Sequence, residues 1–520
     1  MTTGVDAPAP SPARRDASLS APPAIRVHPS DDVAVAIRTV TAGEAIDVGG
    51  ERLTVQEDVP AGHKIALRAI DADEPVAKYG FTIGVATQPI ARGAWVHSHN
   101  LRTRLSGVSS FAYAPVAASR ETPPALMPSF DGYRRRDGRV GTRNEIWILN
   151  TVGCVNHAAE RIARLTTERF AGSGVDGVYA FSHPYGCSQL GDDLKNTQKV
   201  LAGLLRHPNA GGVLVLGLGC ENNQLDALLA VAGDVDRERL RFFNTQDVID
   251  ELEQGTAAVA ELVARVSQDR RVACPASDLI LGHKCGGSDG FSGISANPLV
   301  GRIAERLTGL GGTVLLTEVP EMFGAEQALM NRAVSEDVFR DTVAMIDDFK
   351  QYFIAHDQPI YENPSPGNKA GGLTTLEEKS LGAIQKGGQA AVTRVLRYGE
   401  LARAGEGGLS LLESPGNDGV SSTAMVASGA TMLLFTTGRG TPLGFPAPTI
   451  KVSSNSEIAA KKPHWIDFNA GALLDGSASM DALSDDLFAL VLEVASGRKQ
   501  TNNELHGYRE IAIWKEGVTL

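Results

Sequence analysis

The pattern that decides the fold is seen in Val213-Leu214-Val215-Leu216-Gly217-Leu218-Gly219-Cys220-Glu221-Asn222. A short apolar run ends there in glycine, cysteine and polar side chains. Three further cysteines follow apolar runs in the same way: Cys154 after residues 146–149, Cys187 after residues 178–181, and Cys285 after residues 279–281. Such runs are typical of buried parallel strands, and open α/β sheets bind ligands beyond the carboxyl ends of their strands. The sequence therefore predicts an α/β sheet with thiols and acid–base groups at its strand ends, which indicates a metal-dependent site.

The chain divides into regions with different patterns. From about residue 131, strand patterns alternate with helical ones, as in 145–150 followed by 158–170, which predicts βαβ units and a mostly parallel sheet. Short β runs punctuated by glycines precede that region and predict a compact all-β domain. The predicted division is a disordered N-terminal tail at 1–25, an all-β domain at 26–105, a Ser/Pro/Ala-rich linker at 106–130, a first α/β part at 131–270 and a second at 271–520.

The composition is that of an ordinary globular protein with several domains, since the chain has 520 residues, of which 42% are hydrophobic and 21% charged. The formal charge of −12, without a long basic run, argues against a nucleic-acid partner. We expect no membrane association, because no apolar stretch approaches the ~20 residues that span a bilayer. An odd number of cysteines, five, and no signal-peptide pattern predict a reducing cytoplasm.

Several strand ends carry candidate site residues. His183 and Cys187 bracket a Pro-Tyr-Gly turn, Glu221 follows Cys220, and Asp289 lies four residues past Cys285. Ordinary turn chemistry also favours such residues, but ionisable groups at several separate strand ends favour a functional site. His97 and His99 share one face of a β run, near which His63 lies in a turn, so these histidines form either a metal site or a polar strand end.

Two glycine-rich loops and two arginines are further candidates. Residues 363–372, with Asn368 and Lys369, and residues 414–419, with Asp418, form either anion-binding nests or plain surface turns. Arg439 at a strand end, and similarly Arg143, suits either a bidentate grip on a carboxylate or an outward salt bridge. The glycines at 217 and 219 lack the third glycine of a nucleotide fingerprint, which argues against a nicotinamide or ATP enzyme.

Many uncommon strings occur here in an order that resembles the altronate/galactarate dehydratase family. They include Val96-His97-Ser98-His99-Asn100, Gly141-Thr142-Arg143-Asn144-Glu145 and the stretches 183–193, 217–224, 285–298, 317–327, 363–375 and 436–442. The resemblance covers about residues 26–520. It implies an N-terminal β-clip domain of the SAF type, a linker and a large Rossmann-like α/β region. It also implies Fe²⁺ or Mn²⁺ as cofactor and a dimer or larger homo-oligomer.

The implied reaction is the dehydration of a sugar acid, D-altronate to 2-dehydro-3-deoxy-D-gluconate. Alternatives are a dehydratase for galactarate or another aldonate or aldarate, and a non-catalytic sugar-acid binding protein. Our hypothesis places Cys154, His183, Cys187, Cys220 and Cys285 around one metal region, with an iron–sulfur cluster as the alternative to a single ion. Arg143, Asn368, Lys369 and Arg439 are expected to hold the acid, and His63, His97 and His99 to cap that site or form their own. The acid–base candidates are Glu221, Asp289, Glu318, His183 and Asp418.

Overall fold

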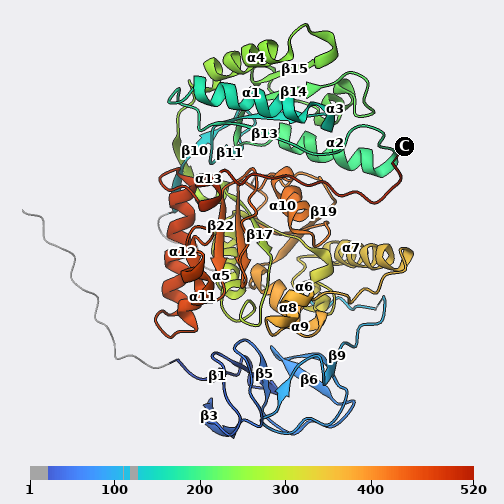
Figure 1. Ribbon diagram of the computed structural model, residues 1–520, viewed down its shortest axis with the longest axis vertical. Coiled ribbons are helices and arrows are strands. Elements are labelled where there is room, and N and C mark those ends of the chain that lie inside the picture. Colours follow the sequence, from blue (N-terminus) through green and yellow to red (C-terminus); the bar gives the residue numbers. More distant parts are fainter. Residues whose placement is uncertain (1–20, 109, 117–126, 404, 520) are drawn as a thin grey trace, which may run out of the picture.

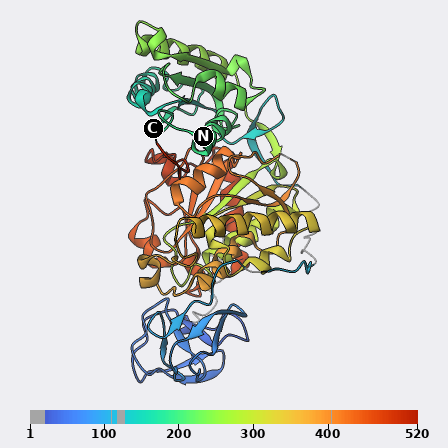
Figure 2. The same cartoon turned by 90° about the vertical axis from the view of Figure 1, so that its right-hand side faces the viewer.

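The computed structural model describes residues 21–108, 110–116, 127–403 and 405–519. It has a small β domain at one end, a large α/β unit in the middle and a smaller α/β unit at the other end (Figure 1), and the view turned by 90° shows the same order (Figure 2). The predicted fold class, a small all-β domain joined to mostly parallel α/β sheets, is confirmed. Most of the predicted tail (residues 1–20) and part of the predicted linker (109 and 117–126) lie outside the described residues.

The N-terminal domain consists of short antiparallel strands. One sheet has the order β1-β2-β5-β8, a second has the order β6-β7-β9, and β3 pairs with β4. The strands are β1 (Ala24–Ile25), β2 (Val33–Ala36), β3 (Ala45–Val48), β4 (Glu51–Thr54), β5 (Lys64–Ala66), β6 (Pro75–Lys78), β7 (Phe81–Ala86), β8 (Trp95–Val96) and β9 (Leu101–Arg102). In β3, Ile46 and Val48 are buried while Ala45 and Asp47 are exposed, so one face of the ribbon packs on the core.

The smaller α/β unit is a parallel sheet with the order β13-β12-β14-β15. Its elements are β12 (Glu145–Asn150), α1 (Asn156–Arg169), β13 (Val178–Phe181), α2 (Gly191–Leu205), β14 (Ala210–Gly217), α3 (Leu225–Ala232), β15 (Leu240–Asn244) and α4 (Glu251–Val266). Alternate residues of β12 face opposite sides: Ile146 and Ile148 pack with α1 and α4, and Trp147 and Leu149 with α2 and α3. A sheet covered on both faces explains why the strand is continuously apolar.

The large unit is a parallel sheet with the order β19-β20-β18-β17-β21-β22-β23. Its strands are β17 (Ile280–Cys285), β18 (Thr313–Leu316), β19 (Val392–Leu396), β20 (Gly408–Leu412), β21 (Met432–Thr437), β22 (Thr449–Ser453) and β23 (Phe468–Asn469). Its helices are α5 (Ala296–Gly309), α6 (Glu326–Met330), α7 (Glu336–Ala355), α8 (Pro366–Ala370), α9 (Leu376–Ala383), α10 (Asp418–Ala427), α11 (Ser456–Lys461), α12 (Met480–Ala495) and α13 (Asn502–Leu505). Leu281 packs on the side of α5 and α12, and Ile280 on the side of α10.

Both α/β sheets meet at the amino ends of their strands. The Thr142 hydroxyl and the Asn209 side-chain amide, which precede β12 and β14, both donate to the carbonyl of Thr431 at 3.0 Å, and Thr431 precedes β21. A small sheet of β10 (Ser129–Arg134), β11 (Val140–Gly141) and β16 (Val272–Pro275) links the two units. Because the amino ends meet, the carboxyl ends open on separate sides of the molecule.

The N-terminal domain docks against the carboxyl end of the large sheet. Lys64 and Lys78 donate to the buried carboxylate of Glu378 at 2.8 and 2.7 Å. A Cβ on Gly290 would lie 1.9 Å from the carbonyl oxygen of Gly62, so the backbones of the two parts approach as closely as only glycine permits. Among the helices that the structure describes, none has the length and apolar character to cross a membrane.

Candidate active site

A buried ionic cluster lies where β17 and β18 end. Lys284 Nζ donates to Glu318 Oε1 and, at 2.7 Å, to Asp418 Oδ1 at the start of α10. Lys386 Nζ, in the 3₁₀ turn η6 (Ile384–Gly387), lies 2.8 Å from Cys285 Sγ and 3.2 Å from Glu318 Oε2. Of these five residues only Asp418 is not buried, and its side chain is 36% exposed. Adjacent parallel strands therefore bring a thiol, carboxylates and ammonium groups together in a dry site.

Glu318 has a strained backbone. It is a non-glycine residue with φ 68° and caps the 3₁₀ turn η5 (Val319–Glu321). That conformation directs the chain so that Glu321 Oε2 accepts from Cys285 Sγ at 3.0 Å, and Lys379 Nζ donates to Glu321 Oε1 at 2.7 Å. Strain of this kind persists only where the surroundings hold it in place, and it concentrates at functional sites.

Burial and the neighbouring charges set the protonation states of the cluster. Burial, with Glu318 and Glu321 nearby, raises the pKa of the Cys285 thiol to about 12, so the thiol is neutral near pH 7. Burial alone would raise the pKa of Glu321, but Lys379 and two other ammonium groups lower it to about 2. Burial would also lower the pKa of Lys386, but the thiol and both glutamates raise it. Three ammonium groups therefore face three carboxylates and a neutral thiol.

Cys285, Glu318 and Glu321 suit a divalent metal ion. One ligand atom from each lies within 4.8 Å of the others, and all three residues are buried. One sulfur and two carboxylate oxygens form a mixed donor set that first-row divalent ions accept. Lys284 and Lys386 bind the same atoms, so an ion would compete with two ammonium groups for them.

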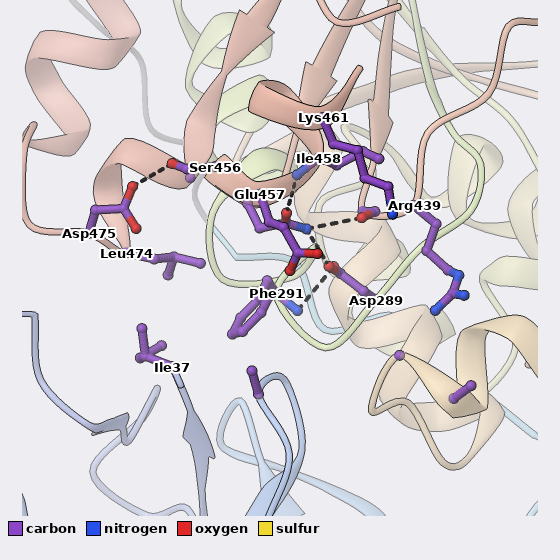
Figure 3. A pocket seen from close by; sticks show the side chains of 16 residues that line it. Ile37, Asp289, Phe291, Arg439, Ser456, Glu457, Ile458, Lys461, Leu474 and Asp475 are labelled. Atoms are coloured by element: carbon purple, nitrogen blue, oxygen red, sulfur yellow. Dashed lines mark hydrogen bonds between the residues drawn. The ribbon is translucent and has the colours of Figure 1, made fainter. Parts of the chain in front are cut away.

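A cavity of about 410 Å³ lies between the large sheet and the N-terminal domain (Figure 3). Arg439, Lys461, Asp289 and Asn455 line it on the sheet side, and Ile37 lines it from the N-terminal domain. Glu457 and Asp475 also line it, so the lining holds two cationic and three acidic side chains, of which only Asp289 is buried. A polar cavity of this size suits a small polar ligand.

Asp289 shapes this cavity. Its carboxylate accepts from Ser454 Oγ at 2.8 Å, Asn455 Nδ2 at 2.9 Å, Ser292 Oγ at 2.9 Å and Phe291 N at 3.1 Å. Burial raises its pKa, against these hydrogen bonds. A carboxylate with so many fixed donors holds the loops after β17 and β22 in place.

Asn368 connects the cavity to the ionic cluster. Its side-chain amide donates to the Ser288 carbonyl at 2.8 Å, and its Oδ1 accepts from Lys379 Nζ at 3.1 Å. Lys369 follows on α8 and is half-buried. The loop at 363–372 is therefore part of the wall between the two features rather than a plain surface turn.

One histidine of the N-terminal domain, His63, contacts that same loop, and His97 and His99 lie beside His63 or beside Trp95. His63 Nε2 donates to the Ala370 carbonyl at 3.3 Å, and its Nδ1 accepts from Trp95 Nε1 at 3.2 Å. The His97 ring lies 4.8 Å from the His63 ring, and among the described residues His97 Nδ1 has no hydrogen-bond partner. Burial lowers the pKa of His97 to about 4, so this imidazole is neutral near pH 7. His99 is exposed and packs on Trp95.

Three family models match the chain in succession. They are "Altronate/galactarate dehydratase SAF domain" over residues 22–104, "D-galactarate dehydratase/Altronate hydrolase, second domain" over 132–267, and "D-galactarate/Altronate dehydratase, C-terminal" over 276–519. The chain belongs to the altronate/galactarate dehydratase family. The resemblance inferred from the motifs is thereby confirmed.

Curated relatives in this family match nearly the whole chain. Altronate dehydratase of Bacillus subtilis is 49% identical, with 95% of this chain and 99% of that protein covered. Altronate dehydratase of Escherichia coli is 51% identical over the same shares of both chains. Galactarate dehydratase (L-threo-forming) of Escherichia coli is 34% identical, with 94% and 96% covered.

The structure divides the ligand set that the sequence predicted for one metal region of this dehydratase. Cys285 lies at the carboxyl end of the large sheet, whereas Cys154, His183, Cys187 and Cys220 follow β12, β13 and β14 of the smaller sheet. A single site for all five was wrong, because the two sheets meet at their amino ends. Both ring nitrogens of His183 are engaged, with the Asn150 carbonyl at 2.8 Å and the Tyr185 N–H at 3.2 Å.

Two other predicted site residues of the dehydratase lie elsewhere. Arg143 precedes β12 and pairs with Glu504 at 2.6 Å, and its other donors bind the carbonyls of Thr142 and Val494. It is buried at an amino-end joint and does not face the cavity, because its guanidinium is fully engaged there. Glu221 accepts from Thr151, Leu218 N and Gly219 N in the smaller sheet, so it is remote from the ionic cluster.

The sequence analysis missed Glu321, Lys379 and Lys386 as site residues. Lys379 and Lys386 are seven residues apart in the helical segment formed by α9 and η6, a spacing that places both on one face. Their burial was the missing information, since lysine is ordinarily a surface residue. The polar run 453–456, which begins at the last residue of β22, was the available signal for the residues that surround Asp289.

Proposed function

We propose that this chain is a hydro-lyase that removes water from D-altronate to give 2-dehydro-3-deoxy-D-gluconate. The observation that carries the proposal is the buried cluster of Lys284, Cys285, Glu318 and Lys386 at the carboxyl end of the large sheet. Identity of about half to curated altronate dehydratases, over 95% of the chain, supports the substrate. Galactarate is the second candidate, since a more distant relative acts on it.

The reaction needs a base for the C2 proton and stabilisation of the charge that follows. The C2 proton is weakly acidic, because the carboxylate beside it is already charged and its removal produces an enediolate with two negative charges. Lys284 and Lys386 remain protonated in the cluster, because the neighbouring carboxylates raise their pKa above the usual value. Fixed ammonium groups in a dry site stabilise such an anion strongly.

We assign the base to Asp418 and a supporting role to Glu318. Asp418 is the member of the cluster whose side chain reaches solvent, at 36% exposure, so substrate has access to it. Its carboxylate takes the C2 proton; the C3–O bond then breaks, and the hydroxyl leaves as water with a proton from an ammonium group. The resulting enol becomes the 2-keto acid. Glu318 holds Lys284 and Lys386 in position.

We assign recognition of the acid to the cavity side chains. Arg439 and Lys461 are exposed on its sheet side, where a guanidinium can bind a carboxylate through two parallel hydrogen bonds. Asn368 and Lys369 extend this polar surface toward the ionic cluster. Asp289 fixes the strand-end loops, and we assign it to positioning rather than proton transfer.

We propose Fe²⁺ or Mn²⁺ as the cofactor; Cys285, as its thiolate, Glu318 and Glu321 would hold the ion, and Lys284 and Lys386 would give up their hydrogen bonds to the ligand atoms when it binds. When bound, such an ion supplies Lewis-acid stabilisation of a substrate oxygen. His63 caps the neighbouring loop through the Ala370 carbonyl, and His97 packs on His63. A cytoplasmic location and a homodimer stay predictions; size-exclusion chromatography with light scattering measures the latter.

The test is an anaerobic keto-acid assay over a panel of aldonates and aldarates, with and without added Fe²⁺. We expect D-altronate to give the highest kcat/KM, and Asp418→Asn to lower its kcat at least 100-fold. Asp485→Asn, at an exposed ion pair with Arg306, is the matched control. A higher kcat/KM for galactarate than for D-altronate would make galactarate the substrate. Thermal stabilisation by altronate without formation of keto acid would show that the chain is a binding protein instead.

A further inference from the structure

Three exposed cysteines of the smaller α/β unit follow three neighbouring parallel strands. Cys154 follows β12, Cys187 follows β13 and Cys220 follows β14, and all three are free thiols. The strand order β13-β12-β14 makes these ends adjacent. Exposed cysteine is uncommon, because free cysteine is among the most buried residue types. Three at one sheet edge therefore need an explanation that packing does not provide.

Hydrogen bonds join the three cysteine loops to one another. Gly153 N donates to the Tyr185 carbonyl at 2.9 Å, which joins the first loop to the second. Asn223 N donates to the Gly186 carbonyl at 3.1 Å, and Ser188 N donates to Asn222 Oδ1 at 2.8 Å, which join the second to the third.

The first and third loops are joined as well, and the contacts are close. Asn223 Nδ2 donates to the Thr151 carbonyl at 2.9 Å. A Cβ on Gly186 would lie 2.0 Å from the carbonyl oxygen of Thr151, so the loops leave no room for a side chain there. The three loops that carry the thiols therefore share one hydrogen-bonded frame.

Polar atoms in this frame lack partners. Among the described residues, Asn150 Oδ1, Gln189 Nε2 and Asn223 Oδ1 are buried without a hydrogen bond, and each of these residues is at most 2% exposed. A buried unsatisfied polar atom costs roughly 1–3 kcal/mol, so three in one set of loops point to an absent group or solvent. Gln246 Nε2 already donates to Cys220 Sγ at 3.6 Å, as side chains do around metal-bound sulfur.

We propose that Cys154, Cys187 and Cys220 hold a [4Fe–4S] cluster. In the part of the chain that the structure describes, the side chains whose ligand atoms all lie within 4.8 Å of one another are Cys285, Glu318 and Glu321, so the three thiols are spaced too widely for one ion. A cluster suits wider spacing, since each thiolate binds a different iron. Each thiol loses its proton on binding, and the iron and sulfide come from cellular iron–sulfur assembly.

Three thiolates leave one iron of the cluster without a protein ligand from these loops. That iron is free to bind an oxygen of water or of a hydroxy acid at the exposed edge of the smaller sheet. The site is separate from the ionic cluster around Cys285, and the inference does not depend on the proposed function.

The test is iron and acid-labile sulfide content, with absorbance near 400 nm, in protein prepared anaerobically and reconstituted with Fe²⁺ and sulfide. Wild type is expected to hold about four sulfides per chain, and about four irons in addition to any ion at Cys285, Glu318 and Glu321. Cys154→Ser, Cys187→Ser and Cys220→Ser should each lower the sulfide at least fivefold. Cys274→Ser, at a buried cysteine, is the matched control and should retain it.

Circular dichroism and thermal melting show whether each variant is folded. One iron without sulfide in wild type, or no sulfide after reconstitution, would overturn the proposal. So would a full cluster in the variant with all three serines. Keto-acid formation from altronate is measured on the same samples: a cluster without dehydration contradicts the proposed function alone, and dehydration without sulfide contradicts this inference alone.

Discussion

Glu378 joins the N-terminal domain to the rest of the chain, and its replacement is the sharpest test of that joint. Its carboxylate accepts from Lys64 Nζ at 2.8 Å, Lys78 Nζ at 2.7 Å and Thr374 N at 2.9 Å, with both lysines and Glu378 fully buried. Glu378→Gln removes the negative charge but keeps the size. Lys64 retains the Gly372 carbonyl at 2.8 Å, whereas Lys78 loses its only hydrogen-bonded carboxylate among the described residues.

The expected loss follows from the cost of a buried, unpaired charge. Removing one partner of a buried ion pair costs about 3–5 kcal/mol. That is a large share of a domain's stability, which is typically about 5–15 kcal/mol. Replacing all three side chains by apolar ones of similar size, as in Lys64→Met/Lys78→Met/Glu378→Leu, should restore most of that loss, because no charge then remains buried.

The assay is the urea midpoint of the transition that releases the N-terminal domain, together with the thermal midpoint. Glu377→Gln is the matched control, since the carboxylate of this buried neighbour accepts from Thr103 Oγ1 and Arg104 N and, within the described part of the chain, binds no ammonium group. We expect the control to cost about 1 kcal/mol. Equal losses in both variants would refute the reasoning, as would a triple variant less stable than Glu378→Gln.

Three further outcomes are expected. Lys386→Met should lower kcat for altronate at least 100-fold, because it removes an ammonium group from the cluster. Lys350→Met, at a buried pair with Glu326, is the control and should change stability but not kcat. Equal losses of kcat in the two variants would contradict a role for the Lys386 ammonium group. Arg439→Ala should raise KM at least tenfold with a smaller effect on kcat, measured by steady-state kinetics. Folding lowers the pKa of Glu321 from 4.5 to about 2. The ionised carboxylate therefore stabilises the fold above pH 4.5, and this contribution is lost as the pH falls toward 2. Glu321→Gln should thus show a smaller loss of thermal stability between pH 5 and pH 3 than wild type.

Much of the fold was predictable because its pattern is local. Apolar runs that end in glycine and cysteine became β12, β13, β14 and β17, and the alternation of strand and helix patterns became two parallel sheets. The direction of each strand also placed cysteines at carboxyl ends. How the two sheets join was not predictable, because the contacts of Thr142 and Asn209 with Thr431 span more than 200 residues of sequence.

The candidate site was predictable only in part, for the same reason. Cys285 was identified from its strand-end motif, Asp418 from the glycine-rich loop 414–419, and Glu318 as an acid–base candidate in the stretch 317–327 that resembles the family. The structure brings the three together. Lys386 was not, because a lone lysine before two glycines is ordinarily exposed, and its burial depends on contacts with β17 and η5. The strand-end motif predicts which residues face an edge, and the tertiary contacts decide which edge they share.

The joint at the amino ends accounts for two separate functional edges in one chain. Parallel strands place their catalytic and binding loops at the carboxyl end, so sheets joined at that end would bury the loops of both. Here Thr142, Asn209 and Thr431 form the joint at the opposite end, and both carboxyl edges stay open. The N-terminal domain then covers the edge of the large sheet through the contacts of Lys64 with Glu378 and of His63 with the Ala370 carbonyl, whereas the thiol edge of the smaller sheet is exposed. Enclosure favours charge stabilisation in a dry site, whereas exposure favours loading of a cluster from outside.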